Sequence, residues 1–550
     1  MPWVMHKRNT IITLDEFYDL HQKTGLTFPT HLDPVPPRAN KLGAMPTFDS
    51  PPGRMRVDGG DPATIKSICQ SIDEMAEKFN KNPKLKSMIS FVEGLDEPCN
   101  LIHRMYSRTQ NPKMADYLNE FSEKLKAEYG FGKFGLPDMF ATKTADSAFE
   151  RIAFWRWWND RYAKHTRTVT AYVKEKLGLE TFVLCRNNCG TIDEIDVALL
   201  ANFDCVAGCD PYPTSSQASF GIARAIYHTG FCTKMFRDLA PKATVVSYGQ
   251  AFNYHGGSPS RADLREWVNQ ALKNGADYLR WYGSGALQQN PELFNESFEI
   301  SRQLQTSVPK LKLPTETKTA IYYSDYDRWG LDDRSAHAPY TIYSLLGEHN
   351  GFWFRFISKV DFNIDGIQLL YIPRMRFTDP VTTAKLVKFV RNGGTIVVLD
   401  PDFLRWNIDK TPVPERAELI GTELISKKLT LPRLTYGKTT LSLSKVSNLQ
   451  LPENGTLHAY DFARLPAGAK VLAAYPDGKP AIIERAFGKG KVIFSAVLPF
   501  GYPDAALNPG GWKKFTADLG KSVGEKADQD IWFFELPEVK NRFFNMKYPN

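Results

Sequence analysis

The sequence is poor in cysteine, in long apolar runs and in clustered charge. Its seven cysteines are a sparse, odd-numbered set among 550 residues, which argues against a disulfide scaffold. No apolar run approaches the roughly 18 residues that a membrane-spanning helix needs, so no membrane partner is expected. The net charge of +8 is spread along the chain without a basic block, and it therefore implies no nucleic-acid partner.

Four of the cysteines form two pairs of equal spacing. Cys185 and Cys189, like Cys205 and Cys209, are separated by three residues. Zinc binding is one interpretation of these pairs, but zinc-binding cysteine pairs typically have two intervening residues and are accompanied by histidines. We favour buried thiols near strand ends, and we expect neither a metal nor a cofactor.

The composition is that of a globular protein with more than one core. Hydrophobic residues make up 42% and charged residues 24%, and a chain of 550 residues predicts about two to four domains. Aromatics, at 13%, suit large cores or clefts that stack sugar rings, and cores are the commoner case. The first residues read as the interior of a protein without a visible signal peptide. A truncated N-terminus is therefore expected, and a bacterial-type cytoplasmic, periplasmic or secreted location stays open.

Residues 1–308 alternate between strand-like and helix-like segments. Strands are expected at 26–32, 88–93, 181–185, 203–208, 244–248 and 277–282, with a weaker candidate at 2–5. Helices are expected at 14–23, 63–80, 114–129, 148–177 and 260–274. This spacing predicts parallel βα units, and a closed (β/α)8 barrel needs eight strands. The sequence thus predicts a TIM-type barrel that lacks its first one or two βα units.

Two further domains are expected after residue 308. Residues 309–412 begin with a linker and then alternate between strands and helices, which predicts a doubly wound α/β domain of flavodoxin or glutamine-amidotransferase type. In its helix at 380–392, Asp379 suits the N-cap and Pro380 the first position. Residues 413–550 read as short alternating strands and predict a C-terminal β-sandwich domain.

The strand ends of the predicted barrel share a polar and aromatic character. In such barrels the residues after each strand face the substrate. The candidate substrate-binding residues are His31, Asp33, Asp96, Asn187, Asn188, Tyr212, Gln250, Arg280, Trp281 and Tyr282. Aromatic rings stack on sugars, and amides and carboxylates bind hydroxyl groups, so the set predicts an oligosaccharide or polysaccharide ligand. Taken singly, each residue is also explained as a strand cap or a turn former.

Hydrolysis of a glycoside needs one carboxyl group as acid and a second group as base or nucleophile. Glu97, which follows the apolar run at 88–92, is the best candidate for the acid. Glu93 is expected to serve in packing or a salt bridge. Asp210 is explained equally well as a second carboxylate and as part of a loop stiffened by prolines. Tyr248 is the other candidate for the second function.

These residues resemble glycoside hydrolase family 42, the retaining β-galactosidases. Asp96-Glu97 stands where the family has Asn-Glu, whose Glu is the acid/base, and residues 209–213 look like its Trp-Asp-Asn-Tyr-Pro segment. Residues 320–324 and 389–395 resemble its trimerisation domain, and residues 478–482 and 487–491 resemble its C-terminal β domain. The resemblance implies a β-linked, galactose-type substrate and a homo-oligomer, either a trimer or a dimer.

Two departures from the family pattern bear on activity. The family's opening strand and helix are missing, and Gly249 falls where the family's Met-Glu-Gln has its nucleophile. A glycine cannot attack an anomeric carbon. Asp96 places a negative charge beside Glu97, which should raise the pKa of one of the two. The sequence therefore predicts a glycosidase with a non-standard second catalytic group. The alternative is a non-hydrolytic, carbohydrate-binding pseudoenzyme with an assembly role.

Overall fold

The computed structural model describes residues 14–25, 27–31, 48–50, 54–56, 61–94, 129, 147–184, 195–214, 225–254, 258–281, 290–307, 314, 316–331, 336–429, 431–444 and 458–527. The strand expected at 2–5 and nearly all of the helix expected at 114–129 lie outside these ranges. We refer to the described residues up to 307 as the barrel unit and to those from 314 as the second unit.

The barrel unit is built on a parallel sheet of six strands in the order β1-β4-β5-β6-β7-β8. All six strands that the sequence predicted with a clear pattern are present, and each lies beside the next in chain order. This succession is that of a TIM-type barrel wall. The strands are β1 (Phe28–His31), β4 (Ile89–Glu93), β5 (Thr181–Leu184), β6 (Val206–Cys209), β7 (Thr244–Gly249) and β8 (Tyr278–Trp281).

Local sequence signals explain where the helices of this unit begin and end. Asp61 caps α3, its carboxylate accepting from the Ala63 amide at 2.8 Å. Ser260 and Asp263 form a reciprocal capping box on α13. Gly178 ends α8 in the left-handed region, with φ +65°. The helices are α1 (Leu14–Thr24), α3 (Pro62–Lys81), α4 (Pro83–Ser87), α8 (Ala148–Leu177), α9 (Val197–Ala201), α12 (His228–Leu239), α13 (Arg261–Lys273) and α15 (Pro291–Ser307); a short ribbon, β2 (Phe48–Ser50) with β3 (Arg54–Arg56), precedes α3.

The second unit is built on one mixed sheet of nine strands in the order β10-β9-β11-β13-β21-β20-β19-β16-β17. The first five are parallel, and pairing from β21 onward is antiparallel. The predicted boundary between residues 412 and 413 thus divides strands that belong to one sheet. The strands are β9 (Thr319–Tyr322), β10 (Arg355–Ile357), β11 (Leu369–Ile372), β13 (Thr395–Val398), β16 (Arg433–Tyr436), β17 (Thr439–Ser442), β19 (Lys470–Ala474), β20 (Pro480–Phe487) and β21 (Gly490–Ser495).

The predicted C-terminal β-sandwich needs correction. In the described residues its strands extend the α/β sheet, and helix α21 (Gly510–Ser522), which the sequence analysis missed, packs against β17. Trp512 of α21 donates its indole N–H to the Ser442 carbonyl at 2.7 Å. An alternating pattern identifies a strand but not its neighbour, so it does not distinguish a sandwich from an extended sheet.

The remaining elements surround this sheet. As predicted, Asp379 caps α18 and Pro380 is its first residue. Helix α17 (His337–Tyr343) continues directly as a π-helical turn, η3 (Ser344–His349). These elements are α16 (Asp325–Gly330), α17 (His337–Tyr343), the π-helix η3 (Ser344–His349), α18 (Pro380–Arg391), α19 (Glu415–Ile420), α20 (Asp504–Leu507), β12 (Phe377–Thr378), β14 (Trp406–Asn407), β15 (Leu424–Lys427) and β18 (Ala459–Phe462).

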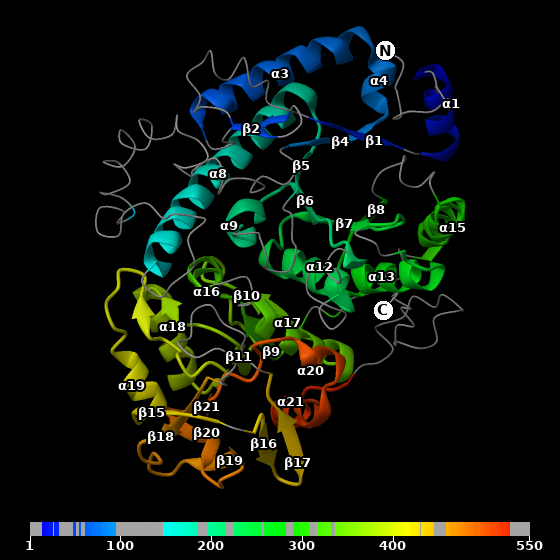
Figure 1. Ribbon diagram of the computed structural model, residues 1–550. Helices are drawn as coiled ribbons and strands as arrows, with labels where there is room; N and C mark the ends of the chain where they lie inside the picture. Colours follow the sequence, from blue (N-terminus) through cyan, green and yellow to red (C-terminus); the bar gives the residue numbers. More distant parts are fainter. Residues whose placement is uncertain are drawn as a thin grey trace.

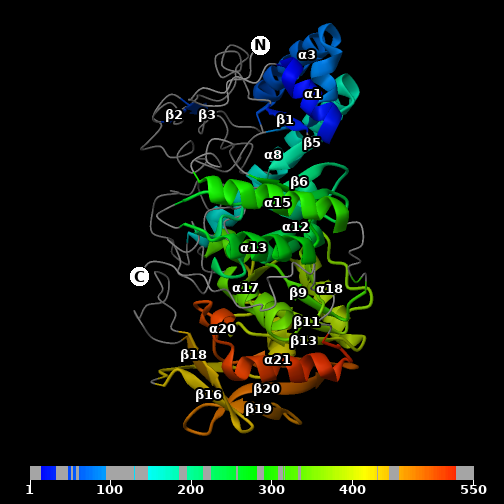
Figure 2. The ribbon, with the colours of Figure 1, turned by 90° about the vertical axis from the view of Figure 1, so that its right-hand side faces the viewer.

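The two units share one hydrophobic core. Helices α9, α12 and α13 lie between the barrel strands and the second unit (Figure 1), and side chains from both units form a single buried cluster. Polar bonds cross the same boundary: Asp238 accepts from the Phe356 amide at 2.8 Å, and Lys359 binds both Asp196 and Asp325. Figure 2 shows the resulting elongated stack, with α21 and β20 at the end away from α3. Apolar packing and buried polar bonds thus both connect the two units.

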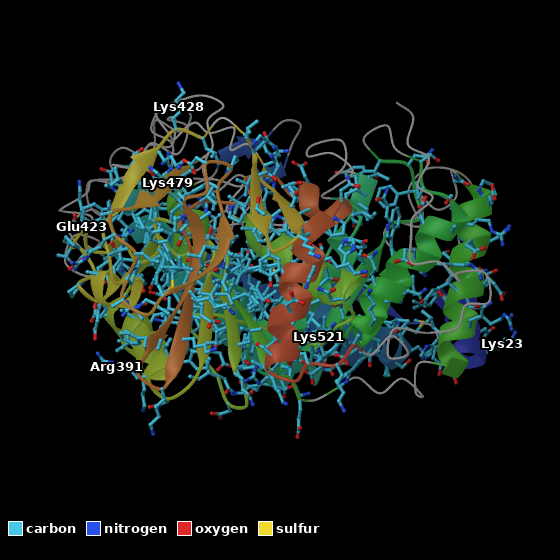
Figure 3. All side chains as sticks on the ribbon, turned by 90° about the horizontal axis from the view of Figure 1, so that it is seen from below. Lys23, Arg391, Glu423, Lys428, Lys479 and Lys521 are labelled. Carbon is cyan, nitrogen blue, oxygen red and sulfur yellow. The ribbon has the colours of Figure 1, made fainter. Side chains whose placement is uncertain are left out.

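Exposed charge is distributed over both units. Figure 3 labels six exposed charged side chains that come from α1, α18, α21 and the strand connections of the second unit. Among them, Lys23 and Arg391 lie at opposite sides of the outline. This distribution agrees with the absence of a basic block in the sequence.

Candidate functional site

A buried hydrogen bond joins two strands that are not neighbours in the barrel sheet. The hydroxyl of Tyr248, on β7, donates to Oε1 of Glu93, the last residue of β4, at 3.2 Å. Both residues are buried. Because β5 and β6 lie between these strands in the sheet, the contact requires the sheet to curl so that the two strand ends face each other.

Arg280 completes a three-residue network with this pair. Its Nη1 donates to Glu93 Oε2 at 3.2 Å and also to the Tyr248 hydroxyl oxygen. Arg280 and Tyr248 are register partners on β8 and β7, which explains their proximity. The guanidinium also lies 4.9 Å from the Tyr248 ring centroid. With 26% of its side chain exposed, Arg280 extends from the buried carboxylate toward solvent.

The network orients the proton of the tyrosine. The Tyr248 hydroxyl has one proton, which is directed at Glu93, while its oxygen accepts from a permanently charged guanidinium. Loss of the proton to Glu93 would leave a phenolate beside a cation. The arrangement can therefore support a tyrosine oxygen acting as a nucleophile, with a carboxylate as its base.

The indole ring of Trp281 occupies the space beside Gly249, the next residue along β7. A Cβ at position 249 would lie 2.6 Å from Cε3 and Cζ3 of the indole ring, a distance that real Cβ contacts do not reach. Trp281 is held in place by its indole N–H, which donates to the Ser301 hydroxyl at 3.0 Å. The position that resembles the nucleophile of the β-galactosidases is thus filled by an anchored aromatic ring.

Gln250 braces the loops that follow β6 and β7. Its amide nitrogen donates to the Thr214 hydroxyl and to the Phe252 carbonyl, and its oxygen accepts from the Thr214 amide at 3.3 Å. Both amide protons are therefore used within the protein. These bonds connect the loops that carry Tyr212 and Phe252, and substrate binding by Gln250 stays a prediction.

An aromatic cluster lies on these loops. Tyr212 packs edge-on against Phe252, with ring centroids 5.3 Å apart, and against Tyr254 at 5.8 Å. Tyr254 is 37% exposed, so this cluster presents a ring to solvent. Such a ring is suited to stacking on a sugar face.

The structure describes only part of the predicted site. It brings Tyr248 and Arg280 together, and it places Tyr212, Gln250 and Trp281 on neighbouring strand ends. Asp210 follows β6, where its carbonyl accepts from the Tyr212 amide at 2.9 Å. His31 is paired with Glu93 in the β1–β4 register, and nothing is described of its side chain. The predicted residues outside the described ranges are Asp33, Glu97, Asp96, Asn187, Asn188 and Tyr282.

Sequence reasoning underrated Glu93 and missed Phe252. Glu93 was expected to form a salt bridge or to pack, and it does form a salt bridge, but with a partner at the strand ends where chemistry would occur. Its position as the last strand residue was the available signal. Phe252 follows β7 closely, so its place after a predicted strand end could have identified it.

Three of the four cysteines in the described residues, Cys205, Cys209 and Cys232, are buried, and Cys69 is half-buried. Burial raises the pKa of the Cys205 thiol to about 12, with Asp204 adding to the effect, so this thiol stays protonated. Within the described ranges no group of three His, Cys, Asp or Glu side chains is arranged to hold a metal ion. No described helix combines the length and apolar character that crossing a membrane requires.

Comparison of sequences finds neither a matching family model nor a matching curated protein. Solved structures do match. A GH42 β-galactosidase from G. stearothermophilus is similar over 93% of this chain and 80% of its own, with 14% identity and a TM-score of 0.67. The chain has the fold of the family 42 β-galactosidases. The enzyme from Bacillus circulans sp. alkalophilus agrees, with 16% identity, 95% and 83% coverage and a TM-score of 0.65.

A second activity occurs among the similar structures. An exo-β-1,4-mannosidase from Opitutaceae bacterium strain TAV5 is similar over 96% of this chain and 89% of its own, with 12% identity and a TM-score of 0.55. The predicted TIM-barrel-type α/β fold is thereby confirmed. At such low identities the likeness extends to the fold, and the chemistry has to be argued from the residues of this chain.

Proposed function

We propose that this protein is a glycoside hydrolase-like protein that takes β-linked, galactose-type oligosaccharides at the strand ends of its barrel. The network of Glu93, Tyr248 and Arg280 carries the proposal. It combines a carboxylate, a phenol and a cation at the strand ends of a barrel whose fold is shared with β-galactosidases and a β-mannosidase. The exposed ring of Tyr254 nearby supplies a face for stacking.

In the catalytic form of the proposal, Tyr248 supplies the second function. Its oxygen attacks the anomeric carbon while its proton passes to Glu93, and Arg280 stabilises the developing phenolate. Glu97 protonates the leaving-group oxygen. Tyrosine nucleophiles are an established exception to the two-carboxylate rule of glycosidases. Asp210 is the other candidate for the second group, as a carboxylate base.

One observation favours a second candidate function, carbohydrate binding without hydrolysis. Trp281 occupies the space beside Gly249, so the position corresponding to the usual nucleophile is not merely empty but filled. A barrel that retained its aromatic surface while losing this position would bind sugars and leave them intact.

Assays of the full chain with aryl β-glycosides and β-linked oligosaccharides separate the two functions. Hydrolysis that falls about 100-fold or more in Glu97→Gln and in Tyr248→Phe, and not in the remote Tyr436→Phe control, supports the catalytic form. Saturable binding with no release of the aryl group, weakened in Tyr254→Ala, supports the binding protein. Neither binding nor release across the panel would reject both.

The assembly role rests on the resemblance of the second unit to a trimerisation domain. We propose a homo-oligomer, a trimer or a dimer, that forms through this unit. Light scattering of the purified chain tests this directly, since a monomer at assay concentrations contradicts it.

A further inference from the structure

Arg280 joins the network at the strand ends through one of its nitrogens, Nη1. Both N–H groups of Nη1 are used, one by Glu93 Oε2 at 3.2 Å and the other by the hydroxyl oxygen of Tyr248. Among the described residues, neither Nε nor Nη2 of Arg280 has a hydrogen-bond acceptor. These two nitrogens form the side edge of the guanidinium, whose parallel N–H groups can bind two oxygen atoms at once.

This free edge of Arg280 can be reached from solvent. The side chain is 26% exposed, and its unpaired nitrogens are not shielded from solvent as Nε of Arg355 and Nε of Arg376 are. In a planar guanidinium the side edge lies opposite Nη1. Because Nη1 points to the buried Glu93, the free edge points away from that carboxylate. It therefore faces the space at the end of β8, beside the ends of β4 and β7.

Two aromatic rings fix the plane of this guanidinium. Its central carbon lies 4.9 Å from the ring centroid of Tyr248, on β7, and 5.7 Å from that of Phe91, on β4. These cation–π contacts and the two hydrogen bonds of Nη1 together hold the side chain in one orientation. The free edge is therefore preorganised, and a ligand that binds it has little side-chain freedom to remove.

Arg237 shows how the chain uses the same edge elsewhere in the barrel unit. Its side chain is exposed to a similar extent, 28%, yet its Nε and Nη2 both donate to the Gly275 carbonyl, at 2.8 and 2.7 Å. Nη2 also binds Asp277. The protein fills the edge of Arg237 with its own oxygen atoms. At Arg280 the described part of the chain supplies no such oxygen, which leaves the edge for a ligand.

We propose that the edge formed by Nε and Nη2 of Arg280 recognises an anionic substituent, a carboxylate or a sulfate ester, on the sugar that binds at the strand ends. This inference rests on the proposed carbohydrate site and names the class of sugar that the site selects. Both groups present oxygen atoms that share a negative charge, and these match the parallel N–H groups better than a neutral hydroxyl does. The net charge of +8 also attracts an acidic polysaccharide at long range.

Recognition of an anion is compatible with the chemistry proposed for Tyr248. The phenol and Glu93 are bound through Nη1, whereas the substituent would occupy the opposite edge, so the two tasks use different N–H groups. The charge of Glu93 is already paired with the guanidinium. An anion at the free edge lies closer to the cation than to this carboxylate, so the attraction exceeds the repulsion.

Calorimetric titration of the full chain with matched sugars tests the assignment. The probes are methyl β-galactoside, methyl β-galacturonide and the 6-sulfate of methyl β-galactoside, which differ only at the sixth carbon. We expect the wild type to bind at least one of the two anionic sugars about 10-fold or more tighter than the neutral one. Arg280→Lys keeps the positive charge but removes the edge, so this ratio should fall to about 3-fold or less. Arg237→Lys, the control of matched exposure, should keep the ratio.

The outcomes separate this inference from the proposed function. Equal binding of neutral and anionic sugars by the wild type would overturn the inference and leave the carbohydrate site standing. A ratio that survives Arg280→Lys would overturn it as well, and no binding of any probe would reject the proposed function together with it. A preference for the galacturonide assigns a carboxylate, and a preference for the sulfated sugar assigns a sulfate ester.

Phe91→Leu covers the case in which Arg280→Lys does not fold. This variant keeps the guanidinium and removes one of the two rings that fix its plane. The ratio of anionic to neutral binding should fall to a value between those of the wild type and Arg280→Lys. An unchanged ratio in Phe91→Leu would count against recognition by this edge.

Discussion

The indole ring of Trp281 lies where a side chain on Gly249 would begin. Two of its ring carbons are 2.6 Å from the position of a Cβ at that glycine. Strands β7 and β8 pair these residues in register, and moving the ring away would break its bond to Ser301. The two residues form a matched pair, a missing side chain on one strand and a large one on the next.

Gly249→Glu should therefore fail to restore the carboxylate of the β-galactosidases. We expect the substitution to lower the free energy of unfolding by about 1–3 kcal/mol through overpacking, measured by urea denaturation, with no gain in glycoside hydrolysis. The double variant with Trp281→Ala should recover part of the loss, because it frees the space. A single variant as stable as the wild type would show that the ring moves freely.

Tyr248→Phe should affect function more than stability. The variant removes one hydroxyl and leaves the ion pair of Glu93 with Arg280 intact, so about 1 kcal/mol of stability is expected to be lost. Any glycoside hydrolysis should fall far more than that loss explains. Tyr436→Phe is the matched control, since Tyr436 also donates to a carboxylate, that of Asp518 at 2.9 Å, in the other unit. Equal effects of both variants on activity would contradict a special role for Tyr248.

Asp327 should make stability depend on pH. Burial, aided by the nearby charge of Asp400, raises the pKa of this carboxyl from 3.8 to about 6. Between about pH 4 and 6 the folded chain keeps a proton that the unfolded chain has lost, so folding takes up a proton. The stabilisation is present in full below about pH 4 and is lost as pH rises through 6, by on the order of 3 kcal/mol.

Asp327→Asn removes this titration. Urea denaturation at pH 4.5 and at pH 7 should show the wild type losing more stability over that interval than the variant does. Asp504→Asn, at an exposed position, should follow the wild type. Parallel curves for the wild type and Asp327→Asn would contradict the raised pKa.

Lys359→Met should weaken the joint between the units. Its ammonium group lies between the buried carboxylates of Asp196 and Asp325, which would be left without their common cation. Breaking a buried pair of this kind costs about 3–5 kcal/mol. Lys514→Met, which breaks an exposed pair with Asp518, should cost at most about 1 kcal/mol. Similar losses of unfolding free energy in the two variants would contradict the role of Lys359.

Local signals in the sequence predicted the elements well. The six barrel strands follow from apolar runs bounded by turns, and the cap at Asp379 follows from its hydrogen-bonding side chain. These features depend on residues within one or two turns of one another. For the same reason the polar character of the strand ends could be predicted from the sequence.

Contacts between distant strands could not be predicted in the same way. Whether Glu93 reaches Tyr248 depends on how the sheet curls, which no single strand encodes. The insertion of β21 beside β13 depends on a pairing between strands that lie far apart in the chain, at Thr395–Val398 and Gly490–Ser495, and the β-rich pattern around β21 favoured a separate sandwich.

The central position of β21 in the sheet has a consequence for folding during synthesis of the chain. β13 ends at Val398, and its sheet partner β21 begins only at Gly490. At typical translation rates, on the order of 5–20 s pass between the synthesis of these two strands. Until β21 has been synthesised, the apolar strand β13 has an unpaired edge on the side that β21 will occupy. A nascent chain cut short before residue 490 keeps that edge open and is a natural client for chaperones and proteases.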